Sequence, residues 1–238
     1  MIETIRSVYA THVGNIRDHN EDRYRLEPEL GLWIVADGMG GHEGGEIASE
    51  MTVDVITRSI EDGESLKQSL VSAHEAVLHA AQSDPRKSGM GSTVVVLRIR
   101  DNRFEIAWVG DSRAYRLSKR YGFKLLTHDH SYIQLMIDNG LIAPHQARNH
   151  PMGHVVSQAI GSSPQGSVCV DFIEGTVEAG DRFLLCTDGL TNELTDDRIA
   201  AVLNQGKSLQ TVVEILLGKA LDAGGLDNIT IVAVEKPA

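Results

Sequence analysis

Residues 93–109 read TVVVLRIRDNRFEIAWV, and this stretch decides the class of fold. Two runs rich in β-branched and aromatic residues, 93–99 and 104–109, are typical of strands, and only four residues separate them. A parallel crossover needs a dozen or more residues, so neighbouring strands this close must pair antiparallel. A third run, 114–117, follows after another short gap. We therefore predict an antiparallel meander here, not a doubly wound nucleotide-binding sheet.

Outside this stretch, apolar periodicity predicts further strands and several helices. The strands are expected at 32–36, 182–187 and 229–234. Helical spacing of apolar residues covers 47–60, 66–81 and 209–220. Strands in the middle with helices outside them indicate an α+β protein in which helices cover antiparallel sheets. We find no linker and predict one domain, 1–238, with a long loop at about 140–168 that fits neither period.

Composition limits the classes of function. The chain has 22 Lys+Arg against 33 Asp+Glu, a formal net charge of −11, which argues against binding to nucleic acid. Two cysteines, Cys169 and Cys186, form no disulfide framework and favour a reducing, cytoplasmic setting. We expect no signal peptide at the N-terminus and no membrane span, since no run of eighteen apolar residues occurs.

Four aspartates lie at the ends of predicted strands, beside Gly or Asn. Asp37, Asp111 and Asp188 follow strands, and Asp227 immediately precedes one. A single Asp-Gly is most often only a turn. A site lined by carboxylates is favoured because four such aspartates lie at strand ends. Arg17 and the run Asn20-Glu21-Asp22 near the start of the chain support it. Such a site suits Mg²⁺ or Mn²⁺, which prefer oxygen ligands, and no Cys/His cluster has the spacing of a zinc site.

At this point the chain resembles a known family. The matching segments, in order, are Arg17-Asp18-His19-Asn20-Glu21-Asp22, Asp37-Gly38-Met39-Gly40-Gly41, Gly91-Ser92-Thr93, Gly110-Asp111-Ser112-Arg113, Thr127-His128-Asp129-His130-Ser131, Asp188-Gly189-Leu190 and Asp227-Asn228. Together they are similar to the metal-dependent serine/threonine protein phosphatases of type 2C, in their compact bacterial form. The resemblance runs from about His12 to about Val234. It implies a central β-sandwich flanked by helices in four layers, with two metals at one end.

The resemblance also implies a role for each matching residue. Asp37 would bridge both metals, the Gly38 carbonyl would hold one of them, and Asp188 and Asp227 would bind the other. Asp111 matches a residue that holds a third, weaker metal, to which Asp188 could also contribute. Asp22 and Glu21 would act on waters held by the metals, and Arg17 would grip the phosphate. Residues 140–168 correspond to the variable flap beside the site.

The implied reaction is hydrolysis of phosphoserine and phosphothreonine in proteins, opposing a Ser/Thr kinase. Phosphate monoesters hydrolyse very slowly without catalysis, and two cations about 3.5–4 Å apart can activate a bridging water. The guanidinium of Arg17 matches phosphate oxygens as a planar fork. No phosphoenzyme is needed. The partners expected are phosphoprotein substrates and a cognate kinase, and we expect a monomer. The alternative is an inactive homologue that only binds phosphoproteins, but inactive members typically lose metal aspartates, and all are present here.

The chain departs from the family at two places. Many eukaryotic members carry a His as presumed general acid where this chain has Met39, and a thioether has no proton to give. The leaving-group proton must then come from a water at the metals or from a His elsewhere. In the flap, bacterial relatives often have His-Pro followed by a basic residue two positions on. Here the run is His150-Pro151-Met152-Gly153-His154, so a contact through that basic residue is in doubt.

Three smaller patterns have a structural interpretation. His145, His150 and His154 could form a metal cluster, but we expect them to be flap residues exposed to solvent. Asp129 precedes a short apolar-periodic stretch and is expected to cap its helix. Residues 201–208 resemble a phosphate-binding loop, but apolar residues with helical spacing precede Gly206, which we expect to cap that helix.

Overall fold

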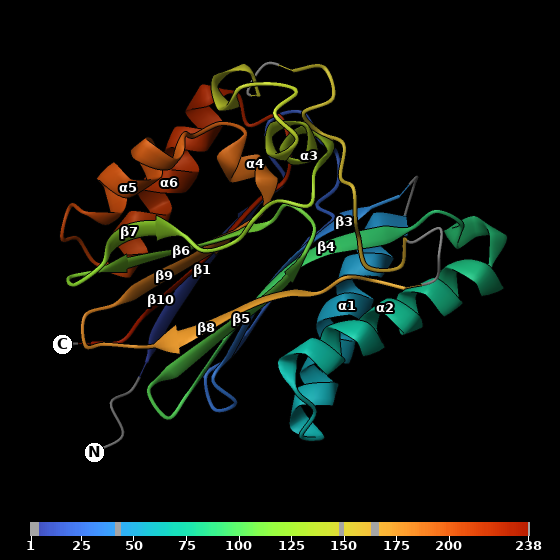
Figure 1. Cartoon of the computed structure of the whole chain (residues 1–238), viewed down its shortest axis with the longest axis horizontal. Helices are drawn as coiled ribbons and strands as arrows, with labels where there is room; N and C mark the ends of the chain where they lie inside the picture. Colours follow the sequence, from blue (N-terminus) through green and yellow to red (C-terminus); the bar gives the residue numbers. More distant parts are fainter. Residues whose placement is uncertain (1–4, 41–43, 148–149, 163–166, 238) are drawn as a thin grey trace.

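Two five-stranded antiparallel sheets lie face to face in the computed structural model, which describes residues 5–40, 44–147, 150–162 and 167–237 (Figure 1). The first sheet has the order β1 (Arg6–His12), β10 (Ile229–Glu235), β9 (Arg182–Cys186), β6 (Arg113–Ser118) and β7 (Gly122–Leu125). The second has the order β2 (Asp22–Glu27), β3 (Leu32–Met39), β4 (Gly91–Arg100), β5 (Arg103–Val109) and β8 (Asp171–Thr176). The predicted α+β sandwich is confirmed.

Helices cover the outer face of each sheet and complete four layers (Figure 1). The elements are α1 (Gly44–Glu61) and α2 (Leu66–Ser83) on the second sheet, α4 (Asp188–Thr191), α5 (Asp196–Leu203) and α6 (Leu209–Ala223) on the first, α3 (Tyr132–Asp138), and the 3₁₀ turns η1 (Pro85–Lys87) and η2 (Pro144–Gln146). The three long predicted helices are therefore present as α1, α2 and α6. None of the helices in the described part of the chain is long and apolar enough to cross a bilayer.

The central strands are apolar on both faces because each face packs against another layer. In β4, Val94 and Val96 contact the layer of α1 and α2, whereas Val95 and Leu97 lie between the two sheets. A third apolar cluster joins β9 and β10 to α5 and α6. This burial on both sides is why the inner strands read as continuous apolar runs in the sequence.

The predicted meander is only partly correct. β4 and β5 do form a two-stranded hairpin, closed by Asp101 and Asn102, which both have positive φ. The next strand, β6, pairs instead with β7 and β9 in the opposite sheet. The chain crosses from one sheet to the other at Gly110 and Asp111. Gly110 has a φ of 105°, which glycine adopts easily because it has no Cβ. A short connection therefore joins strands of different layers.

Two predicted helix caps are wrong. Ser131, not Asp129, caps α3, because its side chain accepts a hydrogen bond from the Gln134 amide at 3.1 Å. The helix before Gly206 does exist as α5, but its C-cap is Asn204. Gly206 lies two residues farther on, with a φ of 67°.

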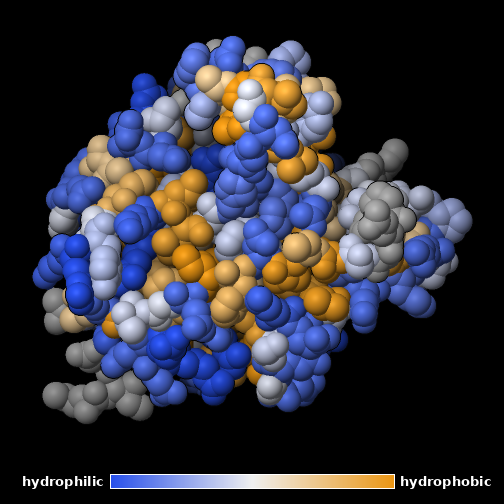
Figure 2. All heavy atoms as spheres, viewed as in Figure 1, coloured by the Kyte–Doolittle hydropathy of each residue, from blue (hydrophilic) through white to orange (hydrophobic). Residues whose placement is uncertain are grey.

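The flap, residues 140–168, holds little regular structure in its described part. It contains η2, and near its end Ile160 exchanges backbone hydrogen bonds of 2.8 and 3.0 Å with Ser92 at the start of β4. Figure 2 shows apolar residues gathered over α3 and the start of the flap. Leu135 and Leu141 are 47% and 70% exposed. Residues 148–149 and 163–166 lie outside the described residues.

Candidate metal centre

The predicted site residues converge at one end of the sandwich. Asp37 lies near the end of β3, Asp111 follows β5, Asp188 begins α4 directly after β9, and Asp227 precedes β10. An open cleft of about 980 Å³ runs over this end of the sheets. The predicted residues that line it are Arg17, Glu21, Asp37, Gly38, Asp111, Asp188 and Asp227. The remaining predicted residue, Asp22, lies beneath the cleft.

Asp22 is the most deeply buried of these carboxylates, with 3% of its surface exposed. It is the direct cross-strand partner of Asp37, so the pairing of β2 with β3 places two carboxylates side by side. Thr187 donates a hydrogen bond to its Oδ2 at 3.0 Å. Its Oδ1 is buried without a partner among the described residues. Burial raises the pKa of Asp22 from 3.8 to about 7, and the charges of neighbouring aspartates add to the rise.

The other carboxylates of the cleft are also partly buried and repel one another. Burial raises the pKa of Asp37 well above its usual value, and Asp22, Asp188 and Asp111 raise it further. Burial and the charge of Asp188 likewise raise the pKa of Asp111, and burial and Asp227 raise that of Asp188. These groups are therefore brought together at an electrostatic cost that a bound cation would offset.

The loop that carries Arg17 and Glu21 is held by Asn228, a residue for which sequence analysis predicted no role. Its side-chain amide donates to the carbonyls of Val13 and His19 at 2.9 and 2.8 Å, and its Oδ1 accepts from the Glu21 amide at 2.7 Å. Asn228 is only 6% exposed. The motif Asp227-Asn228 was visible in the sequence, but nothing there indicated which loop it would hold.

Arg17 extends from this loop into the cleft. Its Nη2 lies 2.9 Å from Asp227 Oδ2, and this hydrogen bond raises the pKa of the guanidinium. The side chain is 56% exposed, so the rest of its planar fork faces solvent in the cleft. Glu21 lies alongside, and burial raises the pKa of its carboxyl, against the lowering effect of Arg17. The two residues could both contact a ligand that enters from solvent.

The backbone at Gly38 passes too close to α1 to allow a side chain. A Cβ there would lie 2.0 Å from the carbonyl oxygen of Gly45 and 2.8 Å from that of Glu21. A Cβ at Gly45 would in turn lie 2.6 Å from the carboxyl carbon of Glu21. The two glycines therefore allow β3, the start of α1 and the Glu21 loop to pack together at the cleft.

His130 holds the turn that carries Asp111, and it also lacked a predicted role. Its backbone amide donates to the Gly110 carbonyl at 2.9 Å, and its Nδ1 accepts from the Gly110 amide at 3.2 Å. On the other side of the turn, the hydroxyls of Thr93 and Ser112 lie 2.8 Å apart. Asp111 is consequently fixed between the sheets and is 7% exposed.

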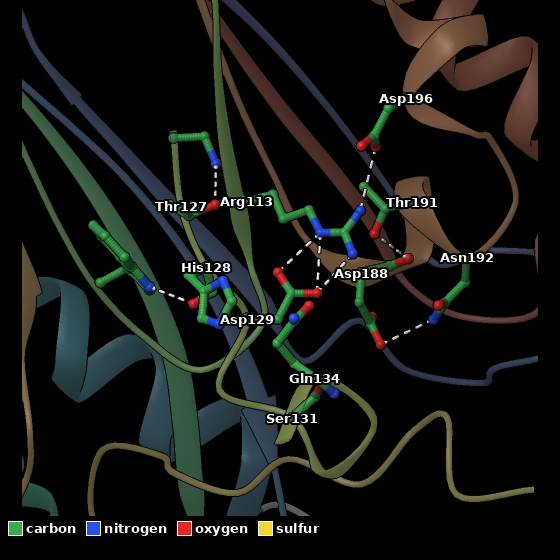
Figure 3. A network of polar contacts seen from close by, with 12 residues as sticks. Arg113, Thr127, His128, Asp129, Ser131, Gln134, Asp188, Thr191, Asn192 and Asp196 are labelled. Carbon is green, nitrogen blue, oxygen red and sulfur yellow. Dashed lines mark hydrogen bonds and ion pairs between the residues drawn. The ribbon is translucent and has the colours of Figure 1, made fainter. Parts of the chain in front are cut away.

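Two sets of polar contacts lie near one another beside the cleft, one around Arg113 and one around Asp188 (Figure 3). Arg113 binds Asp129 through two nitrogens, with Nη2 at 2.6 Å and Nε at 2.9 Å, and its Nη1 lies 3.3 Å from Asp196. Asp129 is thus an ion-pair partner, which explains why it does not cap α3. In the same view Asn192 donates to Asp188 Oδ2 at 3.0 Å and orients that carboxylate.

The donor set of the cleft fits a hard divalent cation. All the candidate ligands are oxygens, and Asp188 Oδ1 is buried without a hydrogen-bond partner in the described part of the chain. Within that part, no three His, Cys, Asp or Glu side chains form a ready-made ligand group. This applies also to His145, His150 and His154, which sequence analysis had considered. Mg²⁺ commonly binds through one or two carboxylates and keeps several waters, so it needs no such group.

Comparison with known proteins identifies the class. Residues 15–213 match the family model of protein phosphatase 2C, so the chain belongs to this family, whose members are metal-dependent phosphatases. It is 32% identical to the serine/threonine phosphatase stp of Listeria monocytogenes, over 96% of this chain and 94% of that protein. It is 34% identical to the protein phosphatase PhpP of Streptococcus pneumoniae, over 94% of this chain and 95% of that protein. The family resemblance read from the motifs is confirmed.

A solved structure shows the same fold. The catalytic domain of the serine/threonine protein phosphatase PstP, in complex with two manganese ions, superposes with a TM-score of 0.87 at 28% identity. The match covers 98% of this chain and 99% of that domain. The arrangement of sheets and helices is therefore that of the bacterial phosphatases of this family.

Proposed function

We propose that this protein hydrolyses phosphoserine and phosphothreonine in proteins at the carboxylate cleft. The observation that carries this function is the convergence of Asp37, Asp111, Asp188 and Asp227 beside Arg17, at one end of a phosphatase fold. Loss of a metal aspartate would favour the inactive, phosphoprotein-binding alternative, and every matching aspartate is present. We propose that residues 1–238 act as one catalytic domain.

Two divalent cations are the proposed cofactors, Mn²⁺ or Mg²⁺, with a third, weaker one at Asp111. Asp37 would bridge the two core ions, the Gly38 carbonyl would contribute to one, and Asp188 and Asp227 to the other. When bound, such ions activate a water as nucleophile and neutralise charge on the phosphoryl group. The raised pKa values of Asp37 and Asp188 support this assignment, because mutually repelling buried carboxylates gain most from a cation.

The protein groups around the ions position the substrate and move protons. Arg17 is proposed to bind two phosphate oxygens through its exposed fork. Glu21 lines the cleft and Asp22 lies directly beneath it, so both can accept hydrogen bonds from water bound in the site. Met39 also lines the cleft but supplies no proton. His19 and His154 line the same cleft, and either of them or a water can protonate the leaving oxygen.

The cellular setting follows from the same features. A phosphoprotein phosphatase requires a kinase that supplies its substrates, and we propose a cognate Ser/Thr kinase as partner. Cys169 and Cys186 are both free, in keeping with a reducing cytoplasm. We propose that the chain works as a monomer. The exposed apolar residues Leu135, in α3, and Leu141, at the start of the flap, support contact between the flap region and protein substrates.

The decisive experiment compares a phosphothreonine peptide with p-nitrophenyl phosphate in Mn²⁺, Mg²⁺ or EDTA. Turnover of both substrates that requires a divalent cation is expected. Arg17→Ala should raise KM for the peptide, because it removes the phosphate-binding fork but none of the proposed ligands. Peptide binding without turnover in either cation would instead support the inactive alternative.

A further inference from the structure

A second cavity lies at the opposite end of the sandwich from the carboxylate cleft. It has a volume of about 1090 Å³ and lies between the β2–β3 turn, the β4–β5 turn and the end of α1. Figure 1 shows these turns at the lower end of the sandwich, whereas α3 and α4 lie at the upper end. The two cavities share no lining residue, so this one is a separate site.

Arg98 lies at this cavity in an unusual state for an arginine. It belongs to β4, on the face that packs toward α1, and only 8% of the residue is exposed. Its Nε is buried and has no hydrogen-bond partner among the described residues. No ion pair joins Arg98 to a described carboxylate, although the charge of its cross-strand neighbour Glu105 acts favourably on it from a longer distance. Its two Nη groups are not buried in this way, so the guanidinium reaches the open cavity with one of its donors, Nε, unpaired.

Two further cations line the same cavity. Lys236 is also 8% exposed, and its Nζ donates to Asn102 Oδ1 at 2.8 Å. Arg100 lies two residues beyond Arg98 in the same strand. Burial lowers the pKa of Arg98, and the positive charge of Arg100 lowers it further. Arg100, which is exposed, and Arg98 therefore repel each other beside the cavity.

The cavity also has acidic residues at its edge. Glu29, Glu61 and Asp101 line it, but all three are exposed. Solvent and salt screen these exposed charges strongly, and also that of the exposed Arg100, whereas the nearly buried Arg98 and Lys236 are screened much less. The interior of the cavity therefore favours an anion even though the protein as a whole carries a charge of −11.

We propose that this cavity binds a small oxyanion, a phosphate or a carboxylate, through the guanidinium of Arg98, with Arg100 and Lys236 beside it. The planar fork of an arginine matches the paired oxygens of both groups. Bound there, the anion would accept hydrogen bonds from the Nη groups of Arg98, which are not buried, and would change the surroundings of the neighbouring Nε. This inference is independent of the proposed phosphatase activity.

The test is a titration of the full, Mg²⁺-loaded protein followed by ¹H–¹⁵N NMR, with inorganic phosphate or succinate as probe. The Nε–H signal of Arg98 and the amide signals of Gly31 and Asn102 should shift and saturate, with half-saturation at about 1 mM or below. A response to phosphate alone identifies a phosphate site, and a response to succinate alone identifies a carboxylate site. No saturable shift at Arg98 Nε with either probe overturns the proposal.

Two variants separate this site from general charge effects and from the cleft. Arg98→Gln should abolish the saturable shifts at Gly31 and Asn102. Arg103→Gln removes the same charge from an exposed arginine of the same hairpin, paired with Glu174, and should leave them intact. Equal loss in both variants would contradict a specific site. Phosphate inhibition of p-nitrophenyl phosphate hydrolysis should be unchanged by Arg98→Gln. If Arg98→Gln does not fold, the titration of the wild-type Arg98 Nε–H signal still tests whether the anion binds.

Discussion

Asp22→Asn, studied in protein freed of divalent cations, tests whether the buried carboxylates oppose folding. Asparagine keeps an oxygen that can accept the hydrogen bond from Thr187. A pKa raised from 3.8 to about 7 corresponds to a penalty of about 4 kcal/mol for ionised Asp22 in the folded state. The folded state therefore holds this proton at pH values where the unfolded state has released it. The free energy of unfolding accordingly falls as pH rises from about 4 to about 7.

The expected difference between variant and wild type thus depends on pH. In EDTA, Asp22→Asn should be more stable than the wild type by up to about 4 kcal/mol at about pH 8. That advantage should shrink toward about pH 4, where the wild-type carboxyl is protonated in both states. Urea unfolding followed by circular dichroism at several pH values measures it. With saturating Mg²⁺ the advantage should disappear, because a bound cation offsets the charge in the wild type.

Either of two results would refute this reasoning. The first is equal stability of the two proteins in EDTA at every pH. The second is a stability difference between Asp22→Asn and wild type that is the same with and without Mg²⁺. It would show that a cation bound in the cleft does not offset the charge of Asp22.

Four further changes give independent tests. Asp37→Asn should remove nearly all activity with the fold retained, since an amide cannot neutralise two cations; circular dichroism and a metal titration check this, and unchanged turnover would contradict the assignment. Asp111→Ala should lower kcat much more than it weakens binding of the two core ions, and calorimetry that finds no remaining tight binding would make Asp111 a core ligand. Shortening the flap, residues 140–168, should change kcat/KM for a phosphothreonine protein by about tenfold, about 1.4 kcal/mol, but p-nitrophenyl phosphate turnover by no more than about twofold. An equal loss on both substrates would mean that the flap supplies catalysis. Asp181→Ala leaves Arg116 buried without its ion-pair partner and should destabilise the protein by about 3–5 kcal/mol in urea unfolding, with kcat unchanged. A loss below about 1 kcal/mol, as for exposed pairs, would show that the pair is not buried in solution.

The inner strands of both sheets were predictable from the sequence, and the edge strands were not. All six predicted strands, β3 to β6, β9 and β10, lie inside the sheets. The four that were missed, β1, β2, β7 and β8, are the four edges. An inner strand such as β3 or β4 is covered on both faces and is largely apolar, so its sequence identifies it. An edge strand such as β2, which reads DRYRLE, is partly exposed, and its partner strand determines its conformation.

The same distinction applies to the site. Asp37, Asp111, Asp188 and Asp227 were predictable because a strand end beside Gly or Asn is a local pattern. The tertiary structure alone decided that Asp22 lies under the cleft, because the pairing of β2 with β3 places it against Asp37. It also decided that Asn228 holds a loop more than 200 residues earlier in the chain. Hydrogen bonds between distant segments depend on how the layers pack, and short-range sequence patterns carry no record of that packing.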